Sequence, residues 1–165
     1  MTYWRSLIAT TAVATTMAIS GLLASGAGAV ELERSNGEVA RLLSAELERH
    51  PGGVVRGNEI RYSTGETFVA VEAGTFSLSQ CTSGRFCGWA QSNYSGSFYY
   101  TTGTGVTKTL SWTARSYSNN RAQGARLYDS TGSSSVCFTP GQDRATIGSS
   151  YYSPDKVFLS STASC

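Results

Sequence analysis

The sequence predicts a mainly β protein, a Greek-key sandwich of two sheets preceded by a short helix and a β-hairpin. Short runs rich in aromatic and β-branched residues recur along residues 86–160, and glycine-containing turns separate them. Only 15% of the residues are charged, whereas Gly occurs 18 times. Short strands at regular spacing, divided by turn residues, are typical of β-sandwiches.

The N-terminus has the pattern of a secretory signal peptide. Arg5 precedes a run of apolar and small residues at 7–23, and Ala27-Gly28-Ala29 has the small-x-small form of a signal-peptidase site. The alternative is a membrane anchor, but Thr and Ser interrupt the run and it is short for a span. We therefore predict that residues 1–29 are a signal peptide and that the protein is secreted and extracellular.

Length and charge narrow the classes of partner. About 136 residues remain after residue 29, which suits one compact domain with a modest appendage. Residues 31–75 carry eight acidic and five basic side chains, and residues 76–165 carry three acidic and seven basic. The basic residues are scattered, which favours a solvated surface over an anion-binding patch. We expect no nucleic-acid partner, no stable membrane insertion and a monomer.

Residues 30–75 differ from the rest, and the segment begins with a predicted helix. Ser35 and Glu38 have the spacing of a capping box, which predicts that the helix starts there. Residues 51–53, Pro-Gly-Gly, end the pattern. The apolar face of this helix consists of Val39, Leu43 and Leu47.

A β-hairpin is predicted after the helix. Residues 54–62 and 66–72 read as two strands joined by the loop Ser63-Thr64-Gly65, in which Gly suits a positive φ. The segment either packs against the following β-domain or is a flexible or removable leader. We place the boundary between an N-terminal segment, residues 30–75, and a β-domain, residues 76–165.

Residues 81–100 predict a stapled turn that leads into a folded hairpin. Cys81 and Cys87 enclose a short polar loop, and Trp89, Tyr94 and Gly96 follow. An aromatic ring can cover such a bend while Gly96 adopts a backbone conformation that other residues disfavour. Most aromatic residues of the β-domain are expected in its core or corners, although an aromatic platform for sugars is an alternative. The predicted strands are residues 86–91, 97–101, 106–112, 114–118, 125–129, 134–138, 144–148 and 156–160.

Four cysteines in an exported chain indicate two disulfides. Three pairings are possible, and we favour Cys81 with Cys87 and Cys137 with Cys165. These bridges would stabilise the fold by roughly 2 to 3 and 3 to 4 kcal/mol. A zinc site is not expected, because there is no Cys-x-x-Cys pair and His50 is the only histidine. We expect no cofactor.

The sequence gives no catalytic constellation. The β-domain contains Asp129, Asp143 and Asp155 but no Glu and no His. His50 follows the predicted helix, where a positive charge complements the helix dipole. Because hydrolysis needs an acid, base, nucleophile or metal brought together, we predict that the protein is not an enzyme.

The order of the motifs resembles that of secreted actinobacterial peptidase inhibitors with a βγ-crystallin-like fold, the Streptomyces metalloproteinase inhibitor family. The resemblance covers roughly residues 81–160 and begins at Cys81-x-x-Gly84-x-x-Cys87 and the Trp89, Tyr94, Gly96 corner. It continues through residues 114–117, Ala-Arg-Ser-Tyr, the turn at Asn119-Asn120 and the pair Leu127-Tyr128, and closes with Cys137, Pro140 and Ala145-Thr146-Ile147-Gly148.

Many microbial βγ-crystallin domains bind calcium through side-chain oxygens. At the corresponding places this sequence has Trp112 and Arg115, and then Asp155 with displaced serines. Both calcium sites are expected to be lost, with Asp155 paired to a nearby cation.

The resemblance implies an inhibitory loop within residues 135–144. Its presented bond would be Cys137-Phe138, and thermolysin-like zinc peptidases favour a bulky apolar residue after the cleaved bond. The family closes this loop with a second cysteine, where this chain has Thr139-Pro140-Gly141. Cys165 would take over that role. The alternative is that Cys137 and Phe138 form an ordinary strand with a disulfide and a core ring.

Three functions follow from these patterns. The first is inhibition of an extracellular zinc metallopeptidase by substrate-like occupation of its active site with the disulfide-anchored loop, Cys137, Phe138, Thr139 and Pro140; an exposed Phe138 would support it. The second is a killer-toxin-like or antifungal βγ-crystallin protein that binds cell wall or membrane through an exposed patch such as Tyr99, Tyr100 and Arg121. The third is a structural extracellular domain, which a buried Phe138 would favour.

Overall fold

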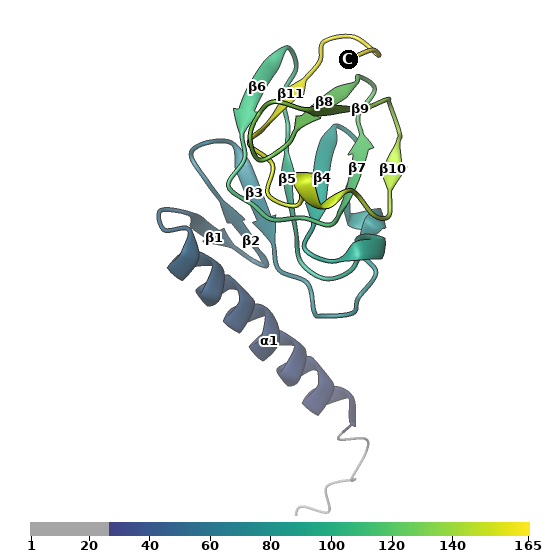
Figure 1. Ribbon diagram of the computed structural model, residues 1–165. Helices are drawn as coiled ribbons and strands as arrows, with labels where there is room; N and C mark the ends of the chain where they lie inside the picture. Colours follow the sequence, from purple (N-terminus) through teal and green to yellow (C-terminus); the bar gives the residue numbers. More distant parts are fainter. Residues whose placement is uncertain (1–26) are drawn as a thin grey trace, which may run out of the picture.

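The computed structural model describes residues 27–165, with side chains from residue 37 onward. It contains one α-helix and two antiparallel sheets of seven and four strands (Figure 1). The predicted mainly β fold with two sheets is therefore confirmed. The predicted signal peptide lies outside the described residues, apart from residues 27–29, which are part of the helix.

The seven-stranded sheet has the order β1-β2-β3-β5-β4-β7-β10. Its central strands bury nearly all of their side chains, as expected for a sheet covered on both faces. The strands are β1 (Val54–Arg56), β2 (Glu59–Arg61), β3 (Glu66–Val69), β4 (Arg85–Trp89), β5 (Phe98–Thr101), β7 (Ser116–Asn120) and β10 (Asp143–Arg144).

The four-stranded sheet has the order β6-β11-β8-β9, so that β9 lies at its edge. Three single-turn 3₁₀ helices connect strands of the molecule: η1 (Leu78–Gln80), η2 (Ser92–Tyr94) and η3 (Ser149–Tyr151). The strands are β6 (Val106–Thr109), β8 (Ala125–Tyr128), β9 (Ser135–Phe138) and β11 (Lys156–Leu159). All eight strands predicted after residue 85 are present, with shifted ends.

Helix α1 (Ala27–Arg49) begins earlier than predicted. The capping-box interpretation of Ser35 is wrong, because the backbone is already helical there. The end is as predicted, since the chain turns at Pro51. Leu43 is buried in the core, and Val39, Leu42 and Leu47 pack against it. The apolar face therefore serves core packing.

The strand predicted at residues 54–62 is instead a hairpin of its own. β1 and β2 pair around Gly57 and Asn58, and Gly57 has a φ of 61°. β3 then pairs with β2 on one side and with β5 on the other. Strands β1 to β3 of the N-terminal segment therefore belong to the main sheet in this structure.

Trp89, Tyr94 and Gly96, the residues of the predicted corner, lie close together in the structure. The rings of Trp89 and Tyr94 meet edge to face with centroids 5.3 Å apart, and the buried indole N–H donates to Oγ of Ser77 at 2.7 Å. Gly96 has a φ of 73°, in the region that favours glycine. The predicted disulfides, Cys81–Cys87 and Cys137–Cys165, are both present.

Candidate functional site

The predicted inhibitory segment spans the end of edge strand β9 and an exposed turn. Cys137 and Phe138 pair with Arg126 and Ala125 of β8. Phe138 is 0% exposed. Its ring packs against Phe86 at 5.4 Å and Tyr117 at 6.0 Å between centroids, and the guanidinium of Arg144 lies 5.1 Å from its centre. The aromatic ring therefore belongs to the core and is not presented to solvent.

Residues 139–142 form a tight turn that does face solvent. The backbone N–H of Gln142 donates to the carbonyl of Thr139 at 3.1 Å, and Gly141 has a φ of 68°. Pro at the second position and Gly with positive φ at the third are typical of a type II turn. The N–H of Thr139 also donates to Oε1 of Gln142 at 2.9 Å. Thr139 and Pro140 are both exposed.

Asn119 of β7 holds both arms of this turn. Its side-chain amide donates to the carbonyls of Phe138 at 3.2 Å and Thr139 at 3.0 Å, before the turn's tip. After the tip, the backbone N–H of Asn119 donates to the carbonyl of Gln142, and the carbonyl of Asn119 accepts from the N–H of Gly141. Asn119 is itself 0% exposed. One buried residue thus fixes the approach to the turn and the departure from it.

The Cys137–Cys165 disulfide anchors the same segment covalently. It joins β9 to the last residue of the chain across a sequence separation of 28. The carbonyl of Cys165 also accepts from Nη2 of Arg126 at 2.8 Å. The C-terminus is thereby tied to the sheet beside the turn, and it lies at the end of the molecule opposite to α1 (Figure 1).

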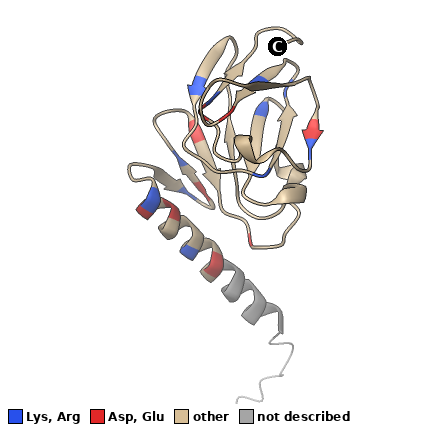
Figure 2. Ribbon diagram, in the orientation of Figure 1, with Lys and Arg blue, Asp and Glu red and all other residues tan. Residues whose placement is uncertain are grey.

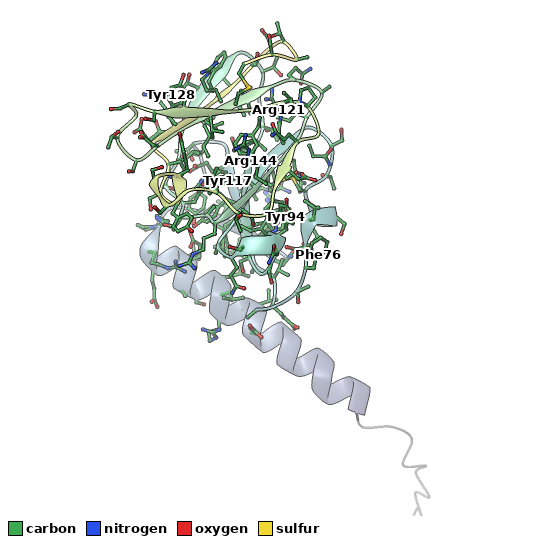
Figure 3. The ribbon with its side chains drawn as sticks, turned by 45° about the vertical axis from the view of Figure 1, so that its right-hand side comes forward. Phe76, Tyr94, Tyr117, Arg121, Tyr128 and Arg144 are labelled. Carbon is green, nitrogen blue, oxygen red and sulfur yellow. A yellow bond between two sulfur atoms is a disulfide. The ribbon has the colours of Figure 1, made fainter. Side chains whose placement is uncertain are left out.

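Arg121 fixes the neighbouring loops from the inside (Figure 3). Its guanidinium donates to the carbonyls of Gly124 and Gly103 at 2.8 Å each and of Ser160 at 3.0 Å. The side chain is buried and forms no ion pair with a carboxylate of the described residues, and burial lowers the pKa of this guanidinium. The sequence did not predict that Asn119 and Arg121 hold loops in place through hydrogen bonds to backbone carbonyls. The only sequence signal near them was the Asn-rich turn.

The other candidate residues do not form a second site. Tyr99, Tyr100 and Arg121 are all buried, so the patch that a wall- or membrane-binding toxin would need is not formed by these residues. Lys and Arg are scattered over the sandwich (Figure 2). Within residues 37–165 no group of three His, Cys, Asp or Glu side chains could hold a metal ion. No helix of the described part of the chain is long and apolar enough to cross a membrane.

The three aspartates of the β-domain have different surroundings. Oδ1 of Asp129 accepts from the hydroxyl and N–H of Thr131 and from the N–H of Ser133. Burial raises the pKa of Asp129, but the backbone of Ser134 and these hydrogen bonds outweigh it, so the pKa is lowered overall. Asp155 lies 3.2 Å from Nζ of Lys156, the ion pair that the sequence predicted. Asp143, beside the turn, has an exposed side chain.

Residues 74–138 match the model of peptidase inhibitor family I36. The I36 match runs from before the Cys81–Cys87 disulfide to Phe138, covers less than half of the chain, and confirms the resemblance that the motifs indicated. The I36 family consists of peptidase inhibitors, which agrees with the prediction that the protein is not an enzyme. No curated protein and no solved structure matches the chain.

Proposed function

We propose that this protein is a secreted inhibitor of an extracellular zinc metallopeptidase and that it docks through the segment from Cys137 to Gln142. The observation that carries the proposal is the I36 match, whose last residues are Cys137 and Phe138. The zinc class of the target rests on the resemblance of the motif order to the metalloproteinase inhibitors. Two disulfides suit a protein that works in an oxidising extracellular environment.

The turn has the rigidity that an inhibitor needs. Asn119 and the Cys137–Cys165 disulfide restrain the segment on both sides of Pro140. A segment that is already ordered loses little conformational entropy on docking, so tight binding can arise from a small contact area. Restraint on both sides would also keep the two ends together if an enzyme cut the turn.

Phe138 takes a different role in this proposal from the one that the resemblance implies. Insertion of the Cys137-Phe138 bond into an active site would pull the ring out of the core, at a cost of roughly 2 to 3 kcal/mol in lost apolar burial. We therefore assign the direct contacts with the enzyme to the exposed Thr139 and Pro140 and to the turn's backbone, with Phe138 as the internal anchor of the segment.

The buried Phe138 is also the observation that favours a second candidate function. A structural extracellular domain, stabilised by two disulfides and without a dedicated ligand, would keep this ring in the core and need no presented segment. Because the two candidates share the same fold, binding to a peptidase decides between them.

Titration of the oxidised chain, residues 30–165, against a thermolysin-type zinc peptidase and a subtilisin-type serine peptidase tests the proposal. We expect stoichiometric loss of the zinc peptidase's activity and recovery of an intact chain. The variant Thr139→Arg should weaken inhibition at least about tenfold, because it places a bulky charge on the contact surface. Ser130→Arg, in the exposed β8–β9 turn of the same sheet, is the matched control and should inhibit like the wild type.

Two other results of the titration would contradict the proposal in whole or in part. A single cut after Cys137 would show that the ring does leave the core and would restore the Cys137-Phe138 bond as the presented one. If neither peptidase is slowed and the chain survives uncut, the inhibitor proposal fails and the structural domain is favoured.

A further inference from the structure

The carboxylate of Asp143 is the free acidic group of the β-domain. Among the described residues it makes no hydrogen bond and no ion pair, whereas Asp129 accepts several hydrogen bonds and Asp155 pairs with Lys156. Asp143 follows the turn directly, at the start of β10, and its backbone pairs with Ser118 of β7. An unpaired carboxylate therefore lies beside the surface that we propose docks on a peptidase.

Asp143 lines a pocket of about 260 Å³ that adjoins the turn. Gly141 contributes the turn's side of the pocket, Ser118 and Asn120 contribute that of β7, and Leu78 and Cys81 contribute the side next to the first disulfide. This volume lies below the range of sites for drug-sized ligands and suits a single side chain. The pocket and the turn share Gly141, so a partner seated on the turn also covers the pocket.

The walls of the pocket are held in place before any partner binds. The Cys81–Cys87 disulfide fixes one wall to β4. The side-chain amide of Asn120 donates to the carbonyl of Cys81 at 2.6 Å, and the carbonyl of Asn120 accepts from the N–H of Gly84 at 2.7 Å. These contacts leave the wall little freedom to close over Asp143.

Among the residues that the structure describes, Asp143 is the only charged one that lines this pocket. The nearest basic residue in sequence, Arg144, is directed toward the interior, where its guanidinium lies over the ring of Phe138 (Figure 3). Arg85, in the neighbouring strand β4, lies over the ring of Tyr100 and donates to the carbonyl of Gln80. Neither arginine forms an ion pair with the Asp143 carboxylate.

We propose that this pocket binds a lysine or arginine side chain of the peptidase when the enzyme docks on the turn. This inference rests on the proposed function and deepens it, because it gives the partner a basic residue beside its active-site cleft. A basic side chain entering a preformed pocket against an unpaired carboxylate forms a charge-assisted hydrogen bond, and arginine can form it with two parallel N–H groups. Complementary charges at the edge of an interface also speed association and add dependence on salt.

The test compares Asp143→Asn and Asp143→Lys with the wild type in the titration against the thermolysin-type peptidase. We expect inhibition to weaken about tenfold for Asn and further for Lys, with a smaller dependence of the association rate on salt. Melting temperatures should stay at the wild-type value, because the carboxylate has no hydrogen-bond or ion-pair partner among residues 37–165. Asp155→Asn, at an aspartate directly before β11 of the other sheet, is the matched control and should inhibit like the wild type.

The outcomes separate this inference from the function on which it rests. If the wild type inhibits and Asp143→Asn inhibits equally well at low salt, the basic-residue pocket is excluded while the inhibitor remains. If the wild type slows no peptidase, the inhibitor proposal and this one fall together. A loss of inhibition that is accompanied by a lower melting temperature and an unchanged salt dependence would assign Asp143 a structural role instead.

Discussion

The hydroxyl of Tyr99 donates a hydrogen bond to Oε1 of Glu46, and this contact joins helix α1 to the seven-stranded sheet. The same oxygen accepts from the hydroxyl of Tyr62 at 3.2 Å and lies 2.7 Å from Nδ1 of His50. Glu46 is 0% exposed. Burial, and then the carboxylate beside it, raise the pKa of Tyr99 far above its ordinary value. A buried polar network therefore attaches the N-terminal segment to the sandwich.

Replacement of Glu46 should destabilise the whole domain. Glu46→Ala leaves the hydroxyls of Tyr62 and Tyr99 without their acceptor inside a buried site, which should lower the free energy of unfolding by about 3 kcal/mol. Urea unfolding measures this. Glu48→Ala, an exposed position two residues further along the same helix, should change the free energy by less than about 0.5 kcal/mol. Equal stabilities for the two variants would mean that the network contributes nothing.

Glu66 should make stability depend on pH. Burial raises the pKa of this carboxyl, and hydrogen bonds from Ser111 and Thr64 offset only part of the effect. Because the pKa is raised on folding, the stabilising contribution is fully present below the unfolded value of about 4.3 and is lost as pH rises through the folded value. Glu66→Gln should therefore raise the melting temperature at pH 7 relative to wild type, and this gain should shrink toward pH 4.

The control for this prediction is Glu48→Gln, which removes a carboxyl from an exposed position. Its melting temperature should follow that of the wild type at both pH values. A Glu66→Gln difference that is the same at pH 4 and pH 7 would show that the Glu66 pKa is unchanged by folding.

Asn119→Ala should loosen the turn. The carbonyls of Phe138 and Thr139 lose their donor, so we expect the free energy of unfolding to fall by about 2 kcal/mol and inhibition to weaken at least about tenfold. Hydrogen exchange at the amide of Gly141 should become faster. Asn58→Ala removes a comparable side-chain hydrogen bond, to the carbonyl of Ala70 at 3.1 Å, far from the turn. It should leave both exchange at Gly141 and inhibition unchanged; a similar loss of inhibition in both variants would assign the effect to general destabilisation.

Gly96→Ala should cost roughly 1 to 3 kcal/mol through backbone strain alone. A Cβ added at this position would have 3.8 Å to its nearest neighbour, Gln91, so crowding is absent and the φ of +73° decides the outcome. Gly37→Ala is the contrasting variant, because Gly37 lies within α1 and no described atom outside the backbone of its own helix turn lies within 4 Å of the added Cβ. It should stabilise by about 0.5 to 1 kcal/mol. If both variants shift the melting temperature in the same direction, the positive φ at Gly96 does not determine the effect of the substitution.

The strands of the β-domain could be predicted because their signals are local. Turn glycines and short apolar runs marked each strand of residues 85–160 within a few positions. The hairpin at residues 54–61 was missed because Gly57-Asn58, a turn signal, lies within an otherwise strand-like run. The early start of α1 was missed because Ser35, a good capping residue, is tolerated inside a helix whose backbone bonds are already formed.

The site depended on contacts that a sequence does not carry. An aromatic residue after Cys137 fits a presented loop and a core strand equally well, and only its packing against Phe86 and Tyr117 separates the two. The role of Asn119 depends on the carbonyls of Phe138 and Thr139, which are distant in the sequence. That of Asp143 depends on the fact that no basic side chain of the described residues pairs with its carboxylate.

The position of β3 between β2 and β5 has a consequence for any shortened form of the protein. A chain that began at residue 74, where the I36 match starts, would lack β1, β2 and β3 and would leave the N–H and carbonyl groups of β5 along one side without partners. Such a bare strand is a template for pairing with other chains. Expression of the matched span alone should yield aggregates or strand-swapped oligomers. Strands β1 to β3 therefore cover the edge of β5 and prevent this sheet from pairing with other chains.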